Sequence, residues 1–173
     1  MLVFIILKKS YKYNKTRGTN SMILKNAVYK WQHSEGYLKQ SGIHWFVWLL
    51  ENPNSPISLT GAVDLENHDL VHILLDRGMT ILDEAMVIGF TMGNSTDTSS
   101  CIKWLFEFCA KYIYPKGYKF NDAEIVEFNR GYAYGYTRPK RNIHLASFNF
   151  IENVSDIRKK WGINIINTKE IEV

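Results

Sequence analysis

The apolar residues of this chain recur at helical spacing along most of its length, and this pattern limits the possible folds more than any other feature. Six segments are predicted to be helices: Gly42–Glu51, Leu65–Arg77, Thr80–Met92, Cys101–Tyr114, Asn121–Tyr136 and Ser155–Trp161. The alternation of period two that marks strands is scarce, and only residues 142–150 form a plausible extended stretch. The sequence therefore predicts an all-α fold, a single-domain helical bundle.

The positive charge of the chain is concentrated at its start. The 173 residues carry a formal net charge of +4, but residues 1–21 hold five basic side chains (Lys8, Lys9, Lys12, Lys15 and Arg17) and no acidic one. The remaining 16 basic and 17 acidic side chains leave residues 22–173 with a net charge of −1. A nearly neutral body argues against a nucleic-acid-binding domain, which needs a basic face of its own.

We therefore divide the chain into a basic extension, residues 1–21, and a helical domain, residues 22–173. The extension has three open interpretations: a dispensable stretch before a domain that begins at Met22, a membrane-surface anchor, or a segment docked on the body. No apolar run approaches the length of about 20 residues that a membrane-spanning helix needs. We expect a cytoplasmic protein, with peripheral contact at the inner face of the membrane as an option.

The two cysteines do not form a disulfide in this interpretation. Cys101 and Cys109 are eight residues apart on one predicted helix. A rise of about 1.5 Å per residue separates them by about 12 Å, which is too far for a bridge. A disulfide-stapled secreted scaffold is therefore excluded, and a reducing compartment is expected.

Candidate metal ligands gather in the segment Asn67–His72, which reads Asn-His-Asp-Leu-Val-His. On a helix, His68, Asp69 and His72 project within an arc of about 100° on one surface. Imidazole nitrogens and carboxylates are the ligands that zinc, iron and manganese take in proteins. These three side chains are therefore candidates for a metal site.

Glu84 is the fourth candidate ligand. It lies twelve residues after His72, and Gly78 is halfway between the two. If the chain reverses at Gly78 into an antiparallel helix pair, Glu84 faces the His/Asp surface across the turn. A divalent ion would then collect two neutral imidazoles and two carboxylates, whose charge of −2 matches it. The predicted metal ligands are His68, Asp69, His72 and Glu84.

At these residues the sequence resembles the coenzyme Q biosynthesis protein 4 family, whose hallmark is His-Asp-x-x-His followed by eleven residues and a Glu. The pattern runs from His68 to Glu84 without a gap. Downstream, Asn129–Arg138 (NRGYAYGYTR) resembles the Gly/Arg-bearing segment of that family. Asp156–Ile163 (DIRKKWGI) is similar to its closing Leu-Arg-x-x-Leu-Gly-Ile. These similarities span residues 62–163, most of the body.

The resemblance implies an all-α fold, a divalent metal usually taken as zinc (Zn²⁺), and a pocket for a polyprenylated ring. It implies a role in ubiquinone (coenzyme Q) assembly, either removal of the ring C1 carboxylate with hydroxylation or organisation of the other pathway enzymes. The partners it implies are a polyprenylated quinone precursor and other ubiquinone-biosynthesis proteins. A homodimer and loose membrane association belong to the same expectation.

Candidate substrate-binding residues come both before and after the predicted metal helices in the sequence. Arg130 and Arg138 are suited to hold a carboxylate or phosphate group. Apolar aromatic side chains are candidates for lining a cavity for the prenyl tail, first Trp45 and Trp48, and with them Phe46, Trp104, Phe106 and Phe108.

Two alternatives stay open at this point. The first is a His-Asp phosphohydrolase, an all-α hydrolase that would recruit His33 or His44 and Asp97 or Asp122 as further ligands. That interpretation leaves the second histidine of the motif and the spacing of Glu84 unexplained. The second alternative is a non-catalytic lipid-binding scaffold, whose metal is structural and has no open coordination position.

Overall fold

The computed structural model describes residues 21–34, 65–116 and 118–165. Its helices are α1 (Leu24–Gln32), α3 (Leu65–Leu75), α4 (Ile81–Asn94), α5 (Ser100–Phe108), α6 (Asp122–Tyr136) and α7 (Val154–Trp161), with a π-helical turn η2 (Cys109–Ile113) and a 3₁₀ turn η3 (Ile143–Leu145). These residues contain no strand, only an isolated bridge between Ile23 and Asn153. The predicted all-α domain is confirmed. The predicted helix Gly42–Glu51 lies outside the described residues.

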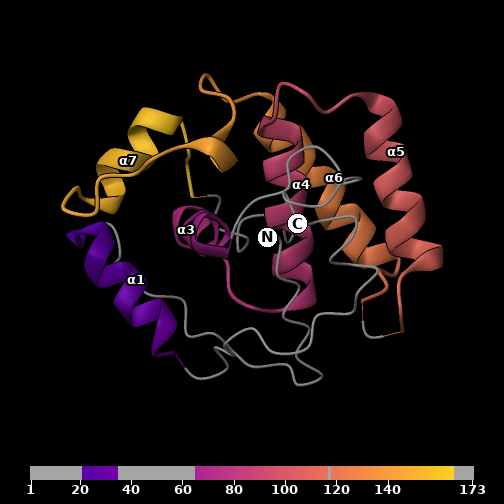
Figure 1. The fold of residues 1–173 in the computed structure, drawn as a ribbon, viewed down its shortest axis with the longest axis horizontal. Coiled ribbons are helices and arrows are strands. Elements are labelled where there is room, and N and C mark those ends of the chain that lie inside the picture. Colours follow the sequence, from indigo (N-terminus) through magenta and orange to yellow (C-terminus); the bar gives the residue numbers. More distant parts are fainter. Residues whose placement is uncertain (1–20, 35–64, 117, 166–173) are drawn as a thin grey trace, which may run out of the picture.

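Helix α4 is the centre of the fold (Figure 1). Every residue of α4 from Glu84 to Asn94 is buried. On one side, apolar residues of α1, α3 and α7 pack around Val87 and Phe90. On the other side, α5, η2 and α6 enclose a second core around Ala85 and Ile88. No helix in the described part is long and apolar enough to cross a membrane.

Glycines let α4 and α6 approach to backbone contact. An ideal Cβ built on Gly89 or Gly93 would lie 2.0 or 2.1 Å from a carbonyl oxygen of α6. A Cβ on Gly131 or Gly135 would lie 2.2 Å from a carbonyl oxygen of α4. The facing positions advance together along both helices, so α4 and α6 run parallel. This contact holds the helix that carries Glu84 in a fixed position.

Two capping boxes set the starts of α4 and α6. The Thr80 hydroxyl accepts a hydrogen bond from the Asp83 backbone N–H at 3.2 Å, and the Asp83 carboxylate accepts one from the Thr80 N–H. Asn121 and Glu124 form the same reciprocal pair before α6, as the sequence predicted. Each box satisfies backbone N–H groups that the first turn of a helix leaves unpaired.

Helix α3 ends at Leu75, two residues before the predicted limit. Asp76 takes a left-handed backbone conformation with φ of 53°, which stops the helix. The buried Arg158 of α7 donates hydrogen bonds to the carbonyl oxygens of Ile73 and Leu74 at 2.7 and 2.8 Å. A cation at the carboxyl end of a helix satisfies its last carbonyl groups and complements its dipole. Helix α7 thereby fixes the end of the helix that carries the two histidines.

Two local predictions differ from the structure. The helix predicted over Cys101–Tyr114 is α-helical only to Phe108, after which the backbone widens into η2. The extended stretch predicted at residues 142–150 is wrong, because that segment begins with Asn142 at φ of 62° and the turn η3. The Asn94 side chain ties it to the end of α4 by accepting a hydrogen bond from the Ile143 N–H at 2.9 Å. This tertiary contact overrides the local pattern.

Candidate metal centre

Helix α3 places two imidazole rings on one buried face. His68 and His72 are one helical turn apart, and their ring centroids lie 4.6 Å from each other. Trp31 of α1 packs against the His72 ring at a centroid distance of 5.1 Å. Both histidines are almost fully buried. The His72 ring therefore contacts both Trp31 and His68, which restricts its orientation.

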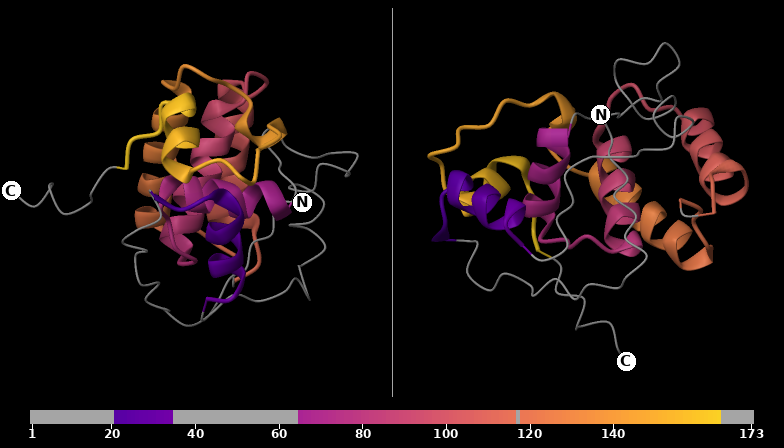
Figure 2. Two further views of the ribbon diagram at one scale, coloured as in Figure 1. Left: turned by 90° about the vertical axis from the view of Figure 1, so that its left-hand side faces the viewer. Right: turned by 60° about the horizontal axis from the view of Figure 1, so that its bottom comes forward.

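Helix α4 brings Glu84 to these rings. In Figures 1 and 2, α3 and α4 cross at a large angle, and α3 is seen nearly end-on in Figure 1. The sequence analysis brought Glu84 to the histidines through an antiparallel helix pair that reverses at Gly78. Glu84 contacts the histidines although α3 and α4 cross instead of lying antiparallel. Glu84 lies in the first turn of α4, next to the connection from α3, and is itself buried. The spacing of His72 and Glu84 around the turn is sufficient to make them meet.

The distances within the group fit a metal ion. The Nε2 atom of His68 lies 3.3 Å from one oxygen of Glu84, and the Nε2 atom of His72 lies 3.3 Å from the other. One ligand atom from each of the three residues falls within 4.8 Å of the others. Two ligands of a tetrahedral zinc ion, each about 2.0–2.1 Å from it, lie about 3.3–3.4 Å apart. The three residues could therefore hold a metal ion.

Within the part of the chain that the structure describes, two buried polar atoms of the group lack a hydrogen-bond partner, which also suggests a bound cation. Nε2 of His68 and Oε2 of Glu84 are buried, and neither has a hydrogen-bond partner among the described residues. They are 3.3 Å apart, but their orientation does not suit a hydrogen bond between them. Buried polar atoms without a partner cost about 1–3 kcal/mol each. A cation between them would satisfy both atoms, so the group could hold a metal ion.

Asp69, the fourth predicted ligand, is buried on α3 but is not one of the three converging residues. Its negative charge acts on His72 from nearby. Among the described residues three side chains converge, and three protein ligands would leave one position of a tetrahedral ion open, as in catalytic zinc sites. Because Asp69 acts on His72 from nearby, the charges of Glu84 and Asp69 together would balance a divalent ion.

In the absence of metal, the charges of the group shift the pKa values of Glu84 and His72. Burial by itself raises the pKa of Glu84, but the positive charges of His72 and His68 outweigh burial and hold the pKa at about 2. Burial lowers the pKa of His72, but the charge of Glu84 and a hydrogen bond to it outweigh burial, so the pKa lies above 6.5. The metal-free site is therefore a buried ion pair.

These shifts predict opposite pH trends for the metal-free and metal-bound protein. Without metal, the stability from His72 is present below pH 6.5 and is lost as pH rises through its raised pKa. The stability from Glu84 is present above pH 4.5 and is lost as pH falls toward about 2. A bound metal requires neutral imidazoles, so its stabilisation grows with pH above about 6.5. Melting curves of chelator-treated and zinc-loaded protein from pH 6 to 8 should diverge; parallel curves would contradict a metal at His72.

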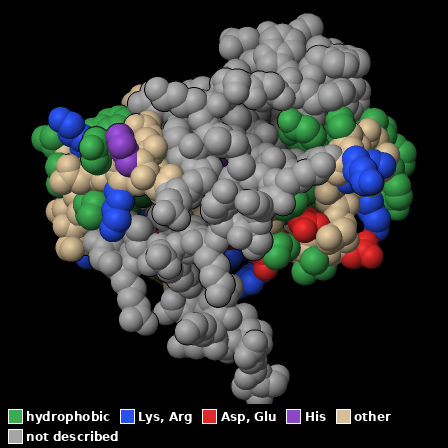
Figure 3. All heavy atoms as spheres, turned by 90° about the horizontal axis from the view of Figure 1, so that it is seen from below, with side chains coloured by type: hydrophobic (Ala, Val, Ile, Leu, Met, Phe, Trp, Pro, Cys, Tyr) green, Lys and Arg blue, Asp and Glu red, His purple; other side chains and the backbone are tan. Residues whose placement is uncertain are grey.

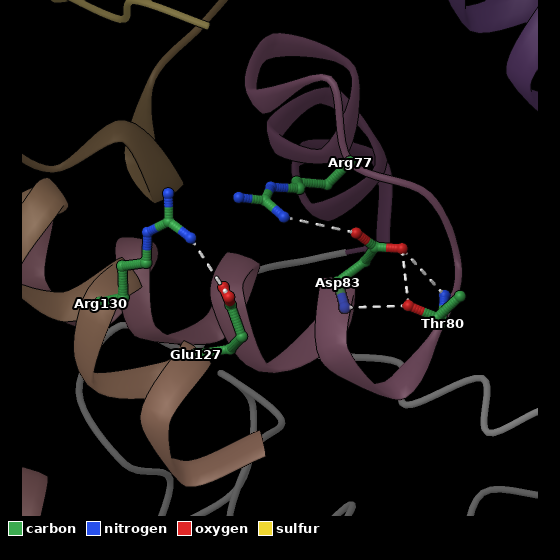
Figure 4. Close-up of polar contacts among 5 residues, drawn as sticks. All are labelled: Arg77, Thr80, Asp83, Glu127 and Arg130. Carbon is green, nitrogen blue, oxygen red and sulfur yellow. Dashed lines mark hydrogen bonds and ion pairs between the residues drawn. The ribbon is translucent and has the colours of Figure 1, made fainter. Parts of the chain in front are cut away.

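Arg77 lies in the connection between α3 and α4, and Arg130 lies on α6. In Figure 4, the guanidinium groups of Arg77 and Arg130 point toward each other. Arg77 pairs with Asp83 at 3.8 Å, and Arg130 pairs with Glu127 at 3.3 Å (Figure 4). Each guanidinium group uses part of its five N–H donors for its ion pair, and the remaining N–H groups are of the kind that hold an anionic group. The sequence singled out Arg130 but missed Arg77, which lies inside the motif between its second histidine and its glutamate.

The other predicted substrate residues have different positions. Arg138 donates hydrogen bonds to the carbonyl oxygens of Tyr134 and Gly162, so its donors serve the fold. Phe106 is buried in the core beside α4, while Trp104 and Phe108 are exposed on α5 instead of lining a cavity. The predicted cavity residues Trp45, Phe46 and Trp48 lie outside the described residues.

Of the residues that a His-Asp phosphohydrolase would recruit, the three that the structure describes are not brought to the site. His33 is exposed at the end of α1, where its ring stacks on Tyr29. Asp97 is exposed after α4, and Asp122 is exposed at the start of α6, paired with Lys111. His44 lies outside the described residues. Among the described residues, only His68, His72 and Glu84 form a group that could hold a metal ion.

Comparison of the chain with family models, curated proteins and solved structures finds no match.

Proposed function

We propose that this protein binds one divalent metal, with zinc as the best fit, and acts on a polyprenylated hydroxybenzoate precursor of ubiquinone. The observation that carries the proposal is the convergence of His68, His72 and Glu84, at the spacing of the motif that resembles coenzyme Q biosynthesis protein 4. Two imidazoles and one carboxylate are a ligand set that zinc takes in hydrolytic enzymes. The reaction class that we propose is removal of the ring C1 carboxylate.

The residues around the site suit an acidic aromatic substrate. A divalent ion held by His68, His72 and Glu84 would supply a Lewis acid that stabilises negative charge on a ring oxygen while the carboxylate leaves as CO₂ and a proton takes its place. Arg130 and Arg77 would hold the carboxylate and fix the ring relative to the metal ligands. The buried faces of α3 and α4 exclude water, which strengthens these charge interactions.

The experiment that tests the function uses Glu84→Gln, which keeps the size of the side chain and removes its charge. We expect the variant to fail to rescue a strain lacking coenzyme Q biosynthesis protein 4, with the C1-carboxylated precursor accumulating in lipid extracts. Circular dichroism should remain helical, with a modest loss of thermal stability from the lost metal. Glu107→Gln is the matched control, because Glu107 forms a surface ion pair with Lys103 on α5.

Two outcomes would redirect the proposal. Full rescue by a Glu84→Gln protein that has lost its metal would favour a scaffold over an enzyme. Mass spectrometry of small molecules that co-purify with the wild type gives a second, strain-independent measurement. A bound isoprenoid would support the proposal, whereas a bound nucleotide with phosphate-releasing activity would favour a phosphohydrolase.

A further inference from the structure

The backbone of Arg77 closes the end of α3. Its N–H group donates a hydrogen bond to the carbonyl oxygen of His72 at 3.0 Å, and the N–H group of Asp76 donates one to the carbonyl oxygen of Ile73 at 3.2 Å. With Asp76 in the left-handed conformation, these two bonds form a Schellman motif, which commonly ends a helix. The main chain of Arg77 is therefore bonded directly to His72, one of the three converging residues.

The side chain of Arg77 reaches the start of α4. Its guanidinium group lies 3.8 Å from Oδ1 of Asp83 (Figure 4). The other carboxylate oxygen, Oδ2, accepts hydrogen bonds from the Thr80 hydroxyl at 2.7 Å and from the Thr80 N–H at 3.4 Å. Asp83 directly precedes Glu84, whose N–H donates to the Thr80 carbonyl oxygen at 2.9 Å. The two oxygens of Asp83 therefore connect the cap of α4 to Arg77.

Arg77 and Asp83, which we call the helix clamp, link the two helices that carry the candidate metal ligands. The helices cross at a large angle (Figure 2), so their contact is short and their packing alone does not fix the distance between ligands on each. The two side chains of the clamp are only 16% and 20% exposed. Solvent and salt screen such a pair less than they screen a fully exposed one. The clamp is therefore suited to hold the end of α3 against the first turn of α4.

We propose that the helix clamp is a positioning device for the metal centre: it sets the distance between His72 and Glu84 and thereby raises the affinity for a divalent ion. Arg77 and Asp83 are not among the three converging residues, so they act through their neighbours. The inference rests on the proposed metal centre and adds residues that determine its affinity. Holding an anionic group, the other role proposed for Arg77, would affect substrate binding but not metal affinity.

The test measures zinc affinity by competition with a fluorescent chelator. Removing a contact that orients metal ligands typically lowers metal affinity by about 10- to 100-fold. Because the clamp acts through the residue before Glu84, we expect Arg77→Met to lower zinc affinity by about tenfold, the weaker end of that range. Asp83→Asn keeps an oxygen for the cap of α4 but loses the charge, so it should lower zinc affinity by a similar factor.

Two further variants identify the contact itself. The double variant Arg77→Met/Asp83→Asn should lose no more zinc affinity than either single variant, because all three remove the same interaction. Arg77→Lys keeps the positive charge and should retain most of the affinity. Losses that add up in the double variant would show that the two residues act separately, and would overturn the clamp.

Lys111→Met is the matched control. Lys111 of η2 pairs at 2.6 Å with Asp122 in the first turn of α6, so this pair also joins the end of one helical segment to the start of the next. Figure 3 shows basic and acidic side chains close together at the edge of the molecule where η2 and the start of α6 lie. Neither residue adjoins a candidate metal ligand in the sequence. We expect wild-type zinc affinity in this variant; a loss equal to that in Arg77→Met would assign the effect to general destabilisation and overturn the proposal.

Hydrogen exchange of the metal-free protein tests the clamp separately from the metal. The N–H group of Glu84 lies in the turn that the clamp holds, so it should exchange about fivefold faster in Arg77→Met than in the wild type, and at the wild-type rate in Lys111→Met. A wild type that binds no zinc would refute the proposed function, while faster exchange in Arg77→Met would still support positioning of Glu84. Unchanged zinc affinity in Arg77→Met, or unchanged exchange at Glu84, would overturn the clamp.

Discussion

Replacing His72 with alanine is expected to reduce the metal content of the purified protein from about one ion per chain to a small fraction of that value. His72 supplies one of the three converging ligand atoms, and the alanine side chain cannot replace it. A native-state metal at about 1,000 times its dissociation constant stabilises a protein by about 4 kcal/mol, so the variant should also melt earlier. Elemental analysis of protein purified without added chelator measures the first effect, and thermal melts measure the second.

Two companion variants make this measurement specific. His33→Ala removes an exposed histidine just after α1 and should retain the full metal content. Asp69→Asn tests the fourth predicted ligand. We expect this variant to retain its metal, because Asp69 is not one of the three residues whose ligand atoms converge. Stoichiometric metal in His72→Ala would remove this residue from the ligand set. If Asp69→Asn lost as much metal as His72→Ala, the result would support Asp69 as a fourth ligand.

The candidate site could be predicted from sequence because its contacts are nearly local. His68 and His72 are one turn apart, which fixes their common face without knowledge of the fold. Glu84 follows a turn in the middle of the motif, so any tight connection between the two helices brings it near His72. Asp69 was harder to assign, since its direction relative to Glu84 depends on how α3 and α4 cross. Arg77 was missed because its partner, Asp83, is also the capping residue of α4.

The parts of the fold that sequence did not predict depend on distant contacts. Helix α1 has no side-chain cap at its start, and its first N–H groups donate to the carbonyl oxygens of Glu152 and Phe150. Such a helix carries no start signal in its own sequence. Residues 142–150 are held by Asn94, which is about fifty positions earlier in the chain. Local periodicity contains no information on either contact.

Replacing Gly131 with alanine is expected to destabilise the protein by about 3 kcal/mol or more, because the new methyl group collides with backbone. An ideal Cβ at this position would lie 2.2 Å from the Met86 carbonyl oxygen of α4. Helix propensity alone predicts the opposite sign, since alanine is better than glycine by about 1 kcal/mol in a helix. The contact decides the sign, because a carbonyl group inside a buried helix cannot move aside unless α4 and α6 separate.

Ala133→Ser is the matched control, because it adds one heavy atom at an exposed position of the same helix and should cost no more than about 0.5 kcal/mol. Denaturant titrations followed by circular dichroism give both free energies of unfolding. Separation of α4 from α6 would also displace Glu84, so Gly131→Ala should lose metal affinity together with stability. A Gly131→Ala protein as stable as the wild type would show that the two helices do not touch at this point. A destabilised variant with unchanged metal affinity would show that the metal centre depends on α3 and the first turn of α4 alone.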